Sequence, residues 1–236
     1  AFAASSAFHY QTVPETRATL LLLAMTRHLP LTSGWKFRRL DDPARAPAAP
    51  AEAVELPHSA FVADLDGNDH WTGRCEYTRV VEIPPLGPGE QLALHVGAAM
   101  HSVVVSVDGV VIGEHLGGYL PAEFDLTSWA HGRTAIELTL RLDNRDNPDI
   151  PPGKPLADLD FCWYGGLYRE VELRIRPAIH ITDAVAAHVT AGGGVFIRTL
   201  ALEPGRAVVH VRTHVRNLSR ADAALTVGAE AADPGG

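Results

Sequence analysis

Cysteine is scarce in this sequence, whose 236 residues include only Cys75 and Cys162. Two cysteines cannot form the framework of several disulfides that holds small secreted domains together. They also lack the Cys-x-x-Cys or Cys/His spacing that binds structural zinc, so we expect no metal site. We expect two thiols that pack as small apolar side chains, and a single disulfide is the alternative.

Positive charge is also in short supply. The sequence has 20 Lys and Arg against 28 Asp and Glu, which gives a formal net charge of −8 at pH 7. Binding to nucleic acid or to an anionic membrane requires a basic face, so this composition argues against both partners. The longest apolar run is Leu20-Leu21-Leu22-Leu23-Ala24-Met25. It is far shorter than the ~20 residues of a membrane-spanning helix.

The first 24 residues are rich in Ala, Ser and Thr and show no strand pattern. Glu15 precedes the apolar run and no small-residue cleavage site follows it, which disfavours a signal peptide. We therefore expect a cytoplasmic rather than a secreted protein. Residues 1–24 are expected to be disordered or an upstream extension, with Met25 as an alternative start. The final Asp-Pro-Gly-Gly is a turn sequence and indicates a truncated chain.

Glycine and proline are plentiful, at 21 and 17 residues, and they separate short runs of Val, Ile and Leu. This pattern is typical of many short strands joined by turns, and it excludes a helix bundle. Asp108-Gly109 predicts a hairpin turn, because both turn positions tolerate positive φ. Alternation of apolar and polar residues predicts strands packed on one face only. The expected strands are 74–83, 91–96, 102–107, 110–113, 135–142 and 170–176.

After Pro177 the composition shifts, and residues 179–236 contain few further strand patterns. Three or four strands are too few to close a sandwich of about seven. The predicted fold is therefore all-β, with a β-sandwich at residues 25–178 followed by an incomplete second sandwich at residues 179–236. The strands expected in this second part are 181–189, 194–202, 207–217 and 223–227.

The stretch from Arg141 to Val171 carries the residues that suit binding chemistry. Asp158 and Asp160 precede a cluster of aromatic residues around Gly165-Gly166. A carboxylate accepts hydrogen bonds from sugar hydroxyls, while an aromatic ring covers the apolar face of the sugar. The same composition also suits a core corner that joins two sandwiches, and composition alone leaves both readings open. The prolines of residues 147–152 predict an extended loop with few hydrogen bonds.

Other chemical motifs are missing or weak. The sequence has no Gly-x-Ser-x-Gly nucleophile elbow, no P-loop and no dinucleotide fingerprint, so no nucleotide cofactor is expected. His210 and His214 have the spacing of a metal pair on a helix. On a strand they are roughly 13 Å apart, too far to share an ion.

Several motifs together resemble the N-terminal sugar-binding domain of glycoside hydrolase family 2, which includes β-galactosidases, β-glucuronidases and β-mannosidases. Their order and spacing agree over about residues 32–176. The motifs are Gly34-Trp35-Lys36-Phe37, Glu55-Leu56-Pro57-His58, Val107-Asp108-Gly109, His115-Leu116-Gly117-Gly118-Tyr119, Phe124-Asp125-Leu126-Thr127, Asp143-Asn144, Pro151-Pro152, and the run from Asp160 through Phe161-Cys162-Trp163-Tyr164-Gly165-Gly166 to Val171. Residues 179–217 resemble the start of the family's immunoglobulin-like second domain.

This resemblance implies a jelly-roll-like sandwich, then an immunoglobulin-like domain, then a (β/α)₈ barrel that carries both catalytic glutamates. The chain stops before any barrel, so it is expected to supply no catalytic residue and to be inactive alone. Asp160 maps onto the family's aspartate at the sugar subsite. Asp158, Trp163 and Asn144 are the other candidate sugar contacts, although core packing also suits Trp163. Asp143 and Asn144 are also expected to fix their loop by bonds to the backbone.

The resemblance favours a retaining β-glycosidase, with β-galactosidase first, whose substrate is a β-galactoside or related β-glycoside. The chain's partner would be its own barrel, and a homo-oligomer of the full enzyme stays open. A stand-alone carbohydrate-binding sandwich is the alternative function, and a purely structural sandwich is the third. Cys162 and Trp163 depart from the family's common Thr and Phe, which leaves the wall of the subsite undefined.

Overall fold

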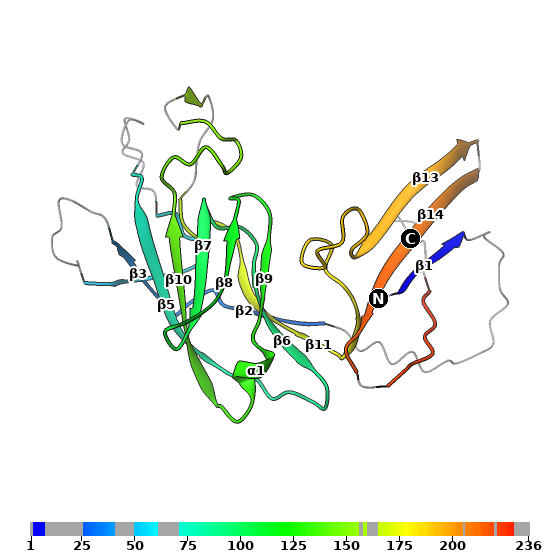
Figure 1. Ribbon diagram of the computed structural model, residues 1–236, viewed down its shortest axis with the longest axis horizontal. Coiled ribbons are helices and arrows are strands. Elements are labelled where there is room, and N and C mark those ends of the chain that lie inside the picture. Colours follow the sequence, from blue (N-terminus) through cyan, green and yellow to red (C-terminus); the bar gives the residue numbers. More distant parts are fainter. Residues whose placement is uncertain are drawn as a thin grey trace. The chain divides into compact units, whose positions relative to one another are not determined.

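The computed structural model describes residues 2–7, 26–40, 50–60, 71–155, 158–159, 165–204, 206–219 and 221–228 (Figure 1). The chain forms two compact units. One is Arg27–Ile175, and the other combines Ala1–Thr26 with Arg176–Gly236. The described residues are almost entirely strands and loops, and the helix among them is α1 (Thr127–Ala130). No helix in this described part has the length and apolar character of a membrane span. The fold is therefore all-β, as the sequence predicts.

The larger unit contains a six-stranded sheet in which each strand pairs antiparallel with its neighbours. Its strands follow the order β4 (Glu52–Val54), β3 (Trp35–Arg39), β5 (Arg74–Glu82), β10 (Ala135–Asp143), β7 (Ser102–Val107) and β8 (Val110–Leu116). The pairs β3–β4 and β7–β8 are consecutive in sequence, whereas β3–β5, β5–β10 and β10–β7 join strands that are not, as in a sandwich rather than a meander.

A four-stranded sheet completes this unit. Its order is β2 (Arg27–Pro30), β11 (Val171–Arg176), β6 (Gln91–Val96) and β9 (Ala122–Asp125). One apolar core lies between the two sheets and draws side chains from both. It includes Trp35, Tyr77 and Leu140 from the larger sheet, and Leu94 and Leu173 from the smaller one. The predicted β-sandwich is thus confirmed.

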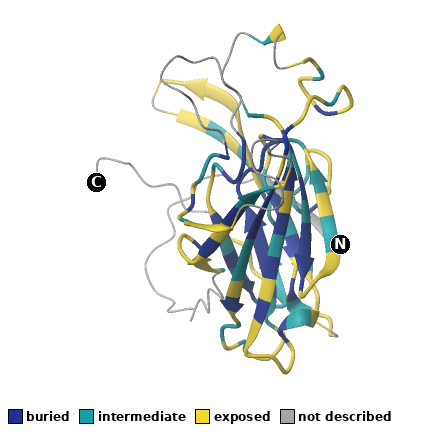
Figure 2. Ribbon diagram, turned by 90° about the vertical axis from the view of Figure 1, so that its left-hand side faces the viewer, coloured by how far each residue is buried: buried dark blue, intermediate teal, exposed yellow. Residues whose placement is uncertain are grey.

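Apolar and polar residues alternate along β10, so that one face of the sheet is buried. Ile136, Leu138, Leu140 and Leu142 are at most 2% exposed, while the residues between them face outward. Alternating bands of buried and less buried residues are visible along the strands in Figure 2. Burial of four such side chains stabilises the fold by about 1.5–3 kcal/mol each before entropy is counted.

The outer face of the same sheet carries an ion-pair cluster. Glu76 is 3% exposed, and its two carboxylate oxygens accept hydrogen bonds from Arg38 and Arg141 on the flanking strands. Burial alone would raise the pKa of Glu76, but these bonds and charges outweigh it and hold that pKa below its usual value.

The hairpin predicted at Asp108-Gly109 is present, with φ of 47° and 80° at its two residues. Here the aspartate does more than tolerate positive φ. Its Oδ1 accepts the Glu137 N–H at 2.8 Å, and its Oδ2 pairs with Arg133. Asp108 therefore fastens the β7–β8 turn to the start of β10 by contacts that include an ion pair, which an asparagine would not make.

The smaller unit is built around β14 (Arg206–Asn217). β13 (Val195–Glu203), β12 (Ile179–Ile181) and β1 (Phe2–Ala7) all pair with it antiparallel. All nine residues of β13 are exposed. Within the described residues of this unit there is a single sheet, so the second layer of a sandwich is not among them.

Three sequence expectations about this unit were wrong. Residues 2–7 form β1, although their sequence shows no strand pattern, because an edge strand needs only backbone pairing. The strand expected at 181–189 ends at Ile181, since the Asp183 carboxylate accepts the N–H groups of Val185 and Ala186 and makes a turn. Residues 223–227 were expected to form a strand but form none in the structure.

Cys75 is a buried free thiol, and burial raises its pKa to about 12. It packs in the core between the sheets, as a small apolar residue would. Cys162 lies outside the described residues.

Candidate functional site

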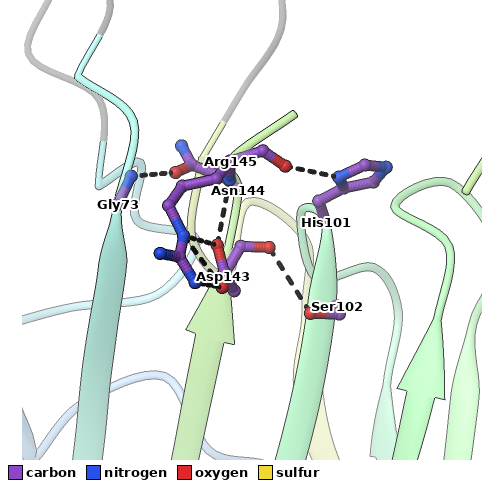
Figure 3. Close-up of polar contacts among 6 residues, drawn as sticks. All are labelled: Gly73, His101, Ser102, Asp143, Asn144 and Arg145. Atoms are coloured by element: carbon purple, nitrogen blue, oxygen red, sulfur yellow. Dashed lines mark hydrogen bonds and ion pairs between the residues drawn. The ribbon is translucent and has the colours of Figure 1, made fainter. Parts of the chain in front are cut away.

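The site begins where β10 ends, at Asp143, Asn144 and Arg145 (Figure 3). The Asp143 carboxylate accepts the Arg145 backbone N–H at 3.0 Å and the Arg145 side chain through Nε at 2.9 Å and Nη2 at 2.5 Å. Burial alone would raise the pKa of Asp143. The hydrogen bonds from Arg145 and the charges of Arg145 and Arg74 outweigh that effect and lower this pKa. Asp143 is therefore a fixed, ionised acceptor at neutral pH.

The Asn144 side chain is directed toward Gly73 and Trp71 and not toward Arg145, and Asn144 is only 5% exposed. Its Oδ1 accepts the Gly73 N–H at 2.7 Å, and its Nδ2 donates to the Trp71 carbonyl at 3.2 Å. The Asn144 backbone N–H also donates to the Gly73 carbonyl at 3.2 Å. The predicted side-chain bonds from Asp143 and Asn144 to the backbone are confirmed. They join the end of β10 to the start of β5.

Gly165 and Gly166 pack against this junction. A Cβ on Gly165 would lie 2.7 Å from Asn144 Nδ2, and a Cβ on Gly166 would lie 2.4 Å from the Tyr77 hydroxyl. The Gly165 carbonyl accepts the Ala60 N–H at 3.1 Å, and the Gly166 carbonyl accepts the Met100 N–H at 3.1 Å. Only glycine leaves room for such close approach. The chain that follows residues 160–164 is therefore fixed between two other segments, one at Ala60 and one at Met100.

Tyr77 and His58 lie beneath the glycines. His58 Nδ1 is 2.8 Å from the Tyr77 hydroxyl, and the two rings meet edge to face. Burial lowers the pKa of His58 and raises that of Tyr77, so both side chains are neutral at physiological pH. This pair is a structural contact of the turn and core.

A cavity of about 280 Å³ opens beside Asp143 at the ends of β7 and β10. The His101 Nδ1 lies 3.4 Å from the Arg145 carbonyl, and the Ser102 hydroxyl lies 3.5 Å from the Asp143 carbonyl (Figure 3). We call this cavity the Asp143 pocket. Its lining residues are His101, Ser102, Asp143, Arg145, Asp146, Asn147 and Ile150.

The loop that borders the pocket is folded rather than extended. Asn147 Oδ1 accepts the Asp149 N–H at 2.9 Å, and its carbonyl accepts the Ile150 N–H at 3.3 Å. The Ile150 carbonyl in turn accepts the Gly153 N–H at 2.8 Å. The prediction of an extended loop with few hydrogen bonds was therefore wrong, because the Asn147 side chain and Gly153 at φ 72° allow two successive turns.

Chemically, the Asp143 pocket offers carboxylate and amide acceptors, guanidinium and hydroxyl donors, and one apolar side chain, that of Ile150. Such a mixture suits a ligand with several hydroxyl groups, each of which both donates and accepts. A metal ion fits less well, because the Arg145 guanidinium lies against the carboxylate that would have to bind it.

Of the four sugar contacts predicted from the sequence, Asp160 and Trp163 lie outside the described residues. Asp158 is exposed, and its backbone N–H donates to the Pro155 carbonyl at 3.0 Å. Asn144 lies between the Asp143 pocket and Gly165, with its amide engaged by backbone groups. The sequence reasoning missed His101, Arg145 and the rest of the pocket lining, because only the fold brings β7 beside the end of β10.

Comparison with known proteins matches residues 31–177 to the family model described as glycosyl hydrolases family 2, sugar binding domain. A β-galactosidase of Thermoanaerobacter pseudethanolicus is 31% identical over 135 residues, which are 56% of this chain and 18% of that protein. A β-glucuronidase of Streptococcus agalactiae is 30% identical over 128 residues, which are 48% of this chain and 21% of that protein. The chain thus corresponds to about a fifth of the length of these relatives.

Solved structures agree with the sequence matches. The crystal structure of an FMN-binding β-glucuronidase from Facaelibacterium prausnitzii L2-6 superposes with a TM-score of 0.67 at 31% identity. The match covers 82% of this chain and 28% of that one. Since the family model spans more than half of the chain and includes the whole described junction of Asn144, Gly165 and Tyr77, the chain belongs to glycosyl hydrolase family 2 through its sugar-binding domain.

Proposed function

We propose that this chain is the N-terminal, non-catalytic region of a retaining β-glycosidase, in which it contributes one wall of the sugar subsite. The observation that carries this proposal is the match of residues 31–177 to the family's sugar-binding domain. The geometry supports it, because Asn144 and Gly165 hold the chain directly after residues 160–164 against the rigid end of β10. A binding segment rooted on strands is positioned more reproducibly than one on a free loop.

In this proposal Asp160 accepts a hydrogen bond from a sugar hydroxyl, or binds a cation that coordinates the oxygen of such a hydroxyl. Asp158 and Trp163 are secondary contacts. Asn144 does not contact the sugar in this proposal, because its amide is hydrogen-bonded to Gly73 and Trp71. It packs against Gly165 and so positions the chain that follows residues 160–164. The Asp160 role comes from its position in the family motif, and mutation of that residue is its direct test.

Hydrolysis with retention requires an acid/base and a nucleophile carboxyl about 5–5.5 Å apart. We propose that both belong to a (β/α)₈ barrel of the same enzyme, and that the 236-residue chain alone does not hydrolyse glycosides. Incubation of the purified chain with nitrophenyl β-glycosides should release no nitrophenol. Turnover that copurifies with the chain and survives removal of contaminating enzymes would contradict this.

The preferred substrate is proposed to be a β-galactoside. Relatives named β-galactosidase and β-glucuronidase match at nearly the same identity, so the comparisons support a β-glycosidase without separating the two. The test is the ratio of kcat/KM for nitrophenyl β-galactoside and nitrophenyl β-glucuronide, measured on the enzyme expressed from the whole reading frame. A ratio that favours the glucuronide would reject the β-galactoside as preferred substrate, but the proposal that the enzyme is a β-glycosidase would stand.

A stand-alone carbohydrate-binding sandwich is the second candidate, because residues 27–175 form a closed unit with its own core. The same expression experiment separates the two functions. Glycosidase activity in the product of the whole reading frame supports the first, and sugar binding without any turnover supports the second.

A further inference from the structure

Three large apolar side chains are exposed within five residues at the end of the sandwich that carries the Asp143 pocket. Leu116 is 60% exposed, Tyr119 43% and Leu120 60%. Leu116 ends β8 and pairs with Ser102, which lines the pocket. Single exposed apolar residues are common on any protein, whereas several together are typical of a surface that another protein covers. We call Leu116, Tyr119 and Leu120 the Tyr119 patch.

The backbone of the loop that carries the patch is held by the chain that follows Gly166. The Tyr168 hydroxyl donates to the Gly118 carbonyl, and Arg169 Nη1 donates to the Tyr119 carbonyl at 3.1 Å. The Arg169 guanidinium also lies 5.6 Å from the centre of the Tyr168 ring, which is within the range of a cation–π contact. The loop backbone is therefore already ordered, so that less entropy is lost when a partner covers the patch.

Met100 connects this loop to Gly166. Gly118 packs so closely on the Met100 side chain that an added Cβ would overlap its sulfur. The Met100 backbone N–H in turn donates to the Gly166 carbonyl at 3.1 Å. On the other side, the Gly117 N–H donates to the carbonyl of His101, a residue that lines the pocket, at 3.0 Å. The patch is thus joined by direct contacts to the pocket and to the chain that directly follows the proposed sugar contacts.

The sequence of the patch limits the chemistry of its partner. Residues 116–121 read Leu-Gly-Gly-Tyr-Leu-Pro and contain no charged side chain. A partner that brought an unpaired charge against Leu116 and Leu120 would lose the hydration of that charge, so an apolar surface is favoured there. Tyr119 adds a hydroxyl that can hydrogen-bond at the rim of a contact, as tyrosines at protein interfaces do.

We propose that the Tyr119 patch is a surface on which the (β/α)₈ barrel of the same enzyme docks. This inference rests on the proposed function, since it assumes that such a barrel belongs to the same polypeptide. The matched segments are 18% and 21% of two relatives, so most of each of those enzymes lies outside the part that this chain resembles. The patch also borders the proposed sugar subsite, whose other walls have to come from the domain with the catalytic carboxyls. Both points favour the barrel over a second copy of this chain.

Oxidation by hydroxyl radicals tests the docking directly, because it reports the exposure of side chains and does not depend on turnover. Oxidation of Tyr119 and Leu120 is measured by mass spectrometry in the isolated 236-residue chain and in the enzyme expressed from the whole reading frame. We expect these side chains to be oxidised at least about fivefold more slowly in the enzyme, as for residues at the core of an interface. Val80, which is 65% exposed on β5, should be oxidised at the same rate in both proteins. Equal rates for Tyr119 and Leu120 in the two proteins would overturn the inference.

Polar substitutions separate docking from folding. Leu120→Asn should leave the urea midpoint of the isolated chain unchanged, because this side chain is already mostly in water. In the whole enzyme the same change should speed thermal inactivation at least about threefold, since it weakens a contact between two domains. Val80→Asn is the matched control and should change neither protein. An unchanged inactivation rate of the Leu120→Asn enzyme, or an equal effect of the Val80→Asn change, would contradict the docking surface.

The outcomes also separate this inference from the proposed function. An active glycosidase in which Tyr119 and Leu120 are oxidised as fast as in the isolated chain contradicts the docking surface alone. A product of the whole reading frame without glycosidase activity contradicts the proposed function, and this inference with it. Sedimentation of the isolated chain tests the other occupant. A dimer that Leu120→Asn dissociates would assign the patch to a second copy and overturn the assignment to the barrel.

Discussion

The Asn144 side-chain oxygen accepts the Gly73 backbone N–H at 2.7 Å, and this bond joins the last residues of β10 to the first residues of β5. Asn144 also donates to the Trp71 carbonyl and touches the position where a Gly165 Cβ would stand. One buried amide thus connects three chain segments that are far apart in the sequence.

Replacement of Asn144 by alanine should destabilise the sandwich by about 1–3 kcal/mol, because it removes the partners of a buried N–H, that of Gly73, and of a part-buried C=O, that of Trp71. The free energy of unfolding in urea measures this loss. Asn147→Ala is the matched control, since Asn147 makes one side-chain bond in a less buried turn and should cost under ~1 kcal/mol. Equal losses for the two variants would contradict the bridging role of Asn144.

Gly166→Ala should destabilise the protein by more than ~3 kcal/mol, because the new methyl group meets the Tyr77 hydroxyl and backbone atoms of residues 58 and 60. Gly109→Ala is the control. Gly109 has a similar φ, 80° against 85°, but nothing lies within 4 Å of its added Cβ. That variant should cost only the ~1–2 kcal/mol of left-handed backbone strain. Thermal unfolding of both variants compares them, and similar losses would show that packing at Gly166 is loose.

Glu76→Gln should lower stability at neutral pH, and the difference from the wild type should vanish in acid. The ordinary pKa of the glutamate is 4.5, and the Arg38 and Arg141 contacts lower it in the folded state. Its stabilising contribution is therefore complete above the unfolded value and is lost as pH falls through the lower, folded value. Urea unfolding measured from neutral pH down to below the lower, folded value follows this loss. A constant difference across that range would contradict it, and Glu82→Gln, at the exposed end of the same strand, serves as the control.

The Cys75 thiol should resist alkylation in the native protein, because the thiolate is the reactive form and burial raises this pKa to about 12. A Cys162→Ser background leaves Cys75 as the only thiol of the chain. Modification by iodoacetamide should then proceed only as fast as the sandwich opens, and it should become rapid in urea. Rapid labelling under native conditions would show that β5 opens locally at this position.

The sequence predicted the strands with strong alternation, such as β10 with its four inward-facing apolar residues. It located β3 only through the family resemblance, because five residues are too few for a clear period. It missed β1, whose pairing with β14 depends on backbone groups alone. It misjudged residues 182–189 because the turn made by the Asp183 carboxylate is a local competitor of the strand.

The candidate site was predictable only in part. Asp143 and Asn144 were expected to bind the backbone at a strand end, and they do. His101 could not be assigned to the Asp143 pocket from the sequence, since it meets Arg145 only through the register of β7 against β10. The loop is folded because the Asn147 side chain accepts the Asp149 N–H, whereas the prolines of residues 147–152 led to the prediction of an extended loop.

The central claim is that this domain forms one wall of the sugar subsite of a β-glycosidase, with Asp160 as its contact. The most direct measurement is kcat/KM for a nitrophenyl β-galactoside on the enzyme that contains this chain, with and without Asp160→Ala. Asp149→Ala serves as a control that removes an exposed carboxylate from a neighbouring loop. The account predicts at least a tenfold loss for Asp160→Ala, about 1.4 kcal/mol of transition-state stabilisation, and little change for the control. Unchanged kinetics in the Asp160→Ala enzyme would contradict it.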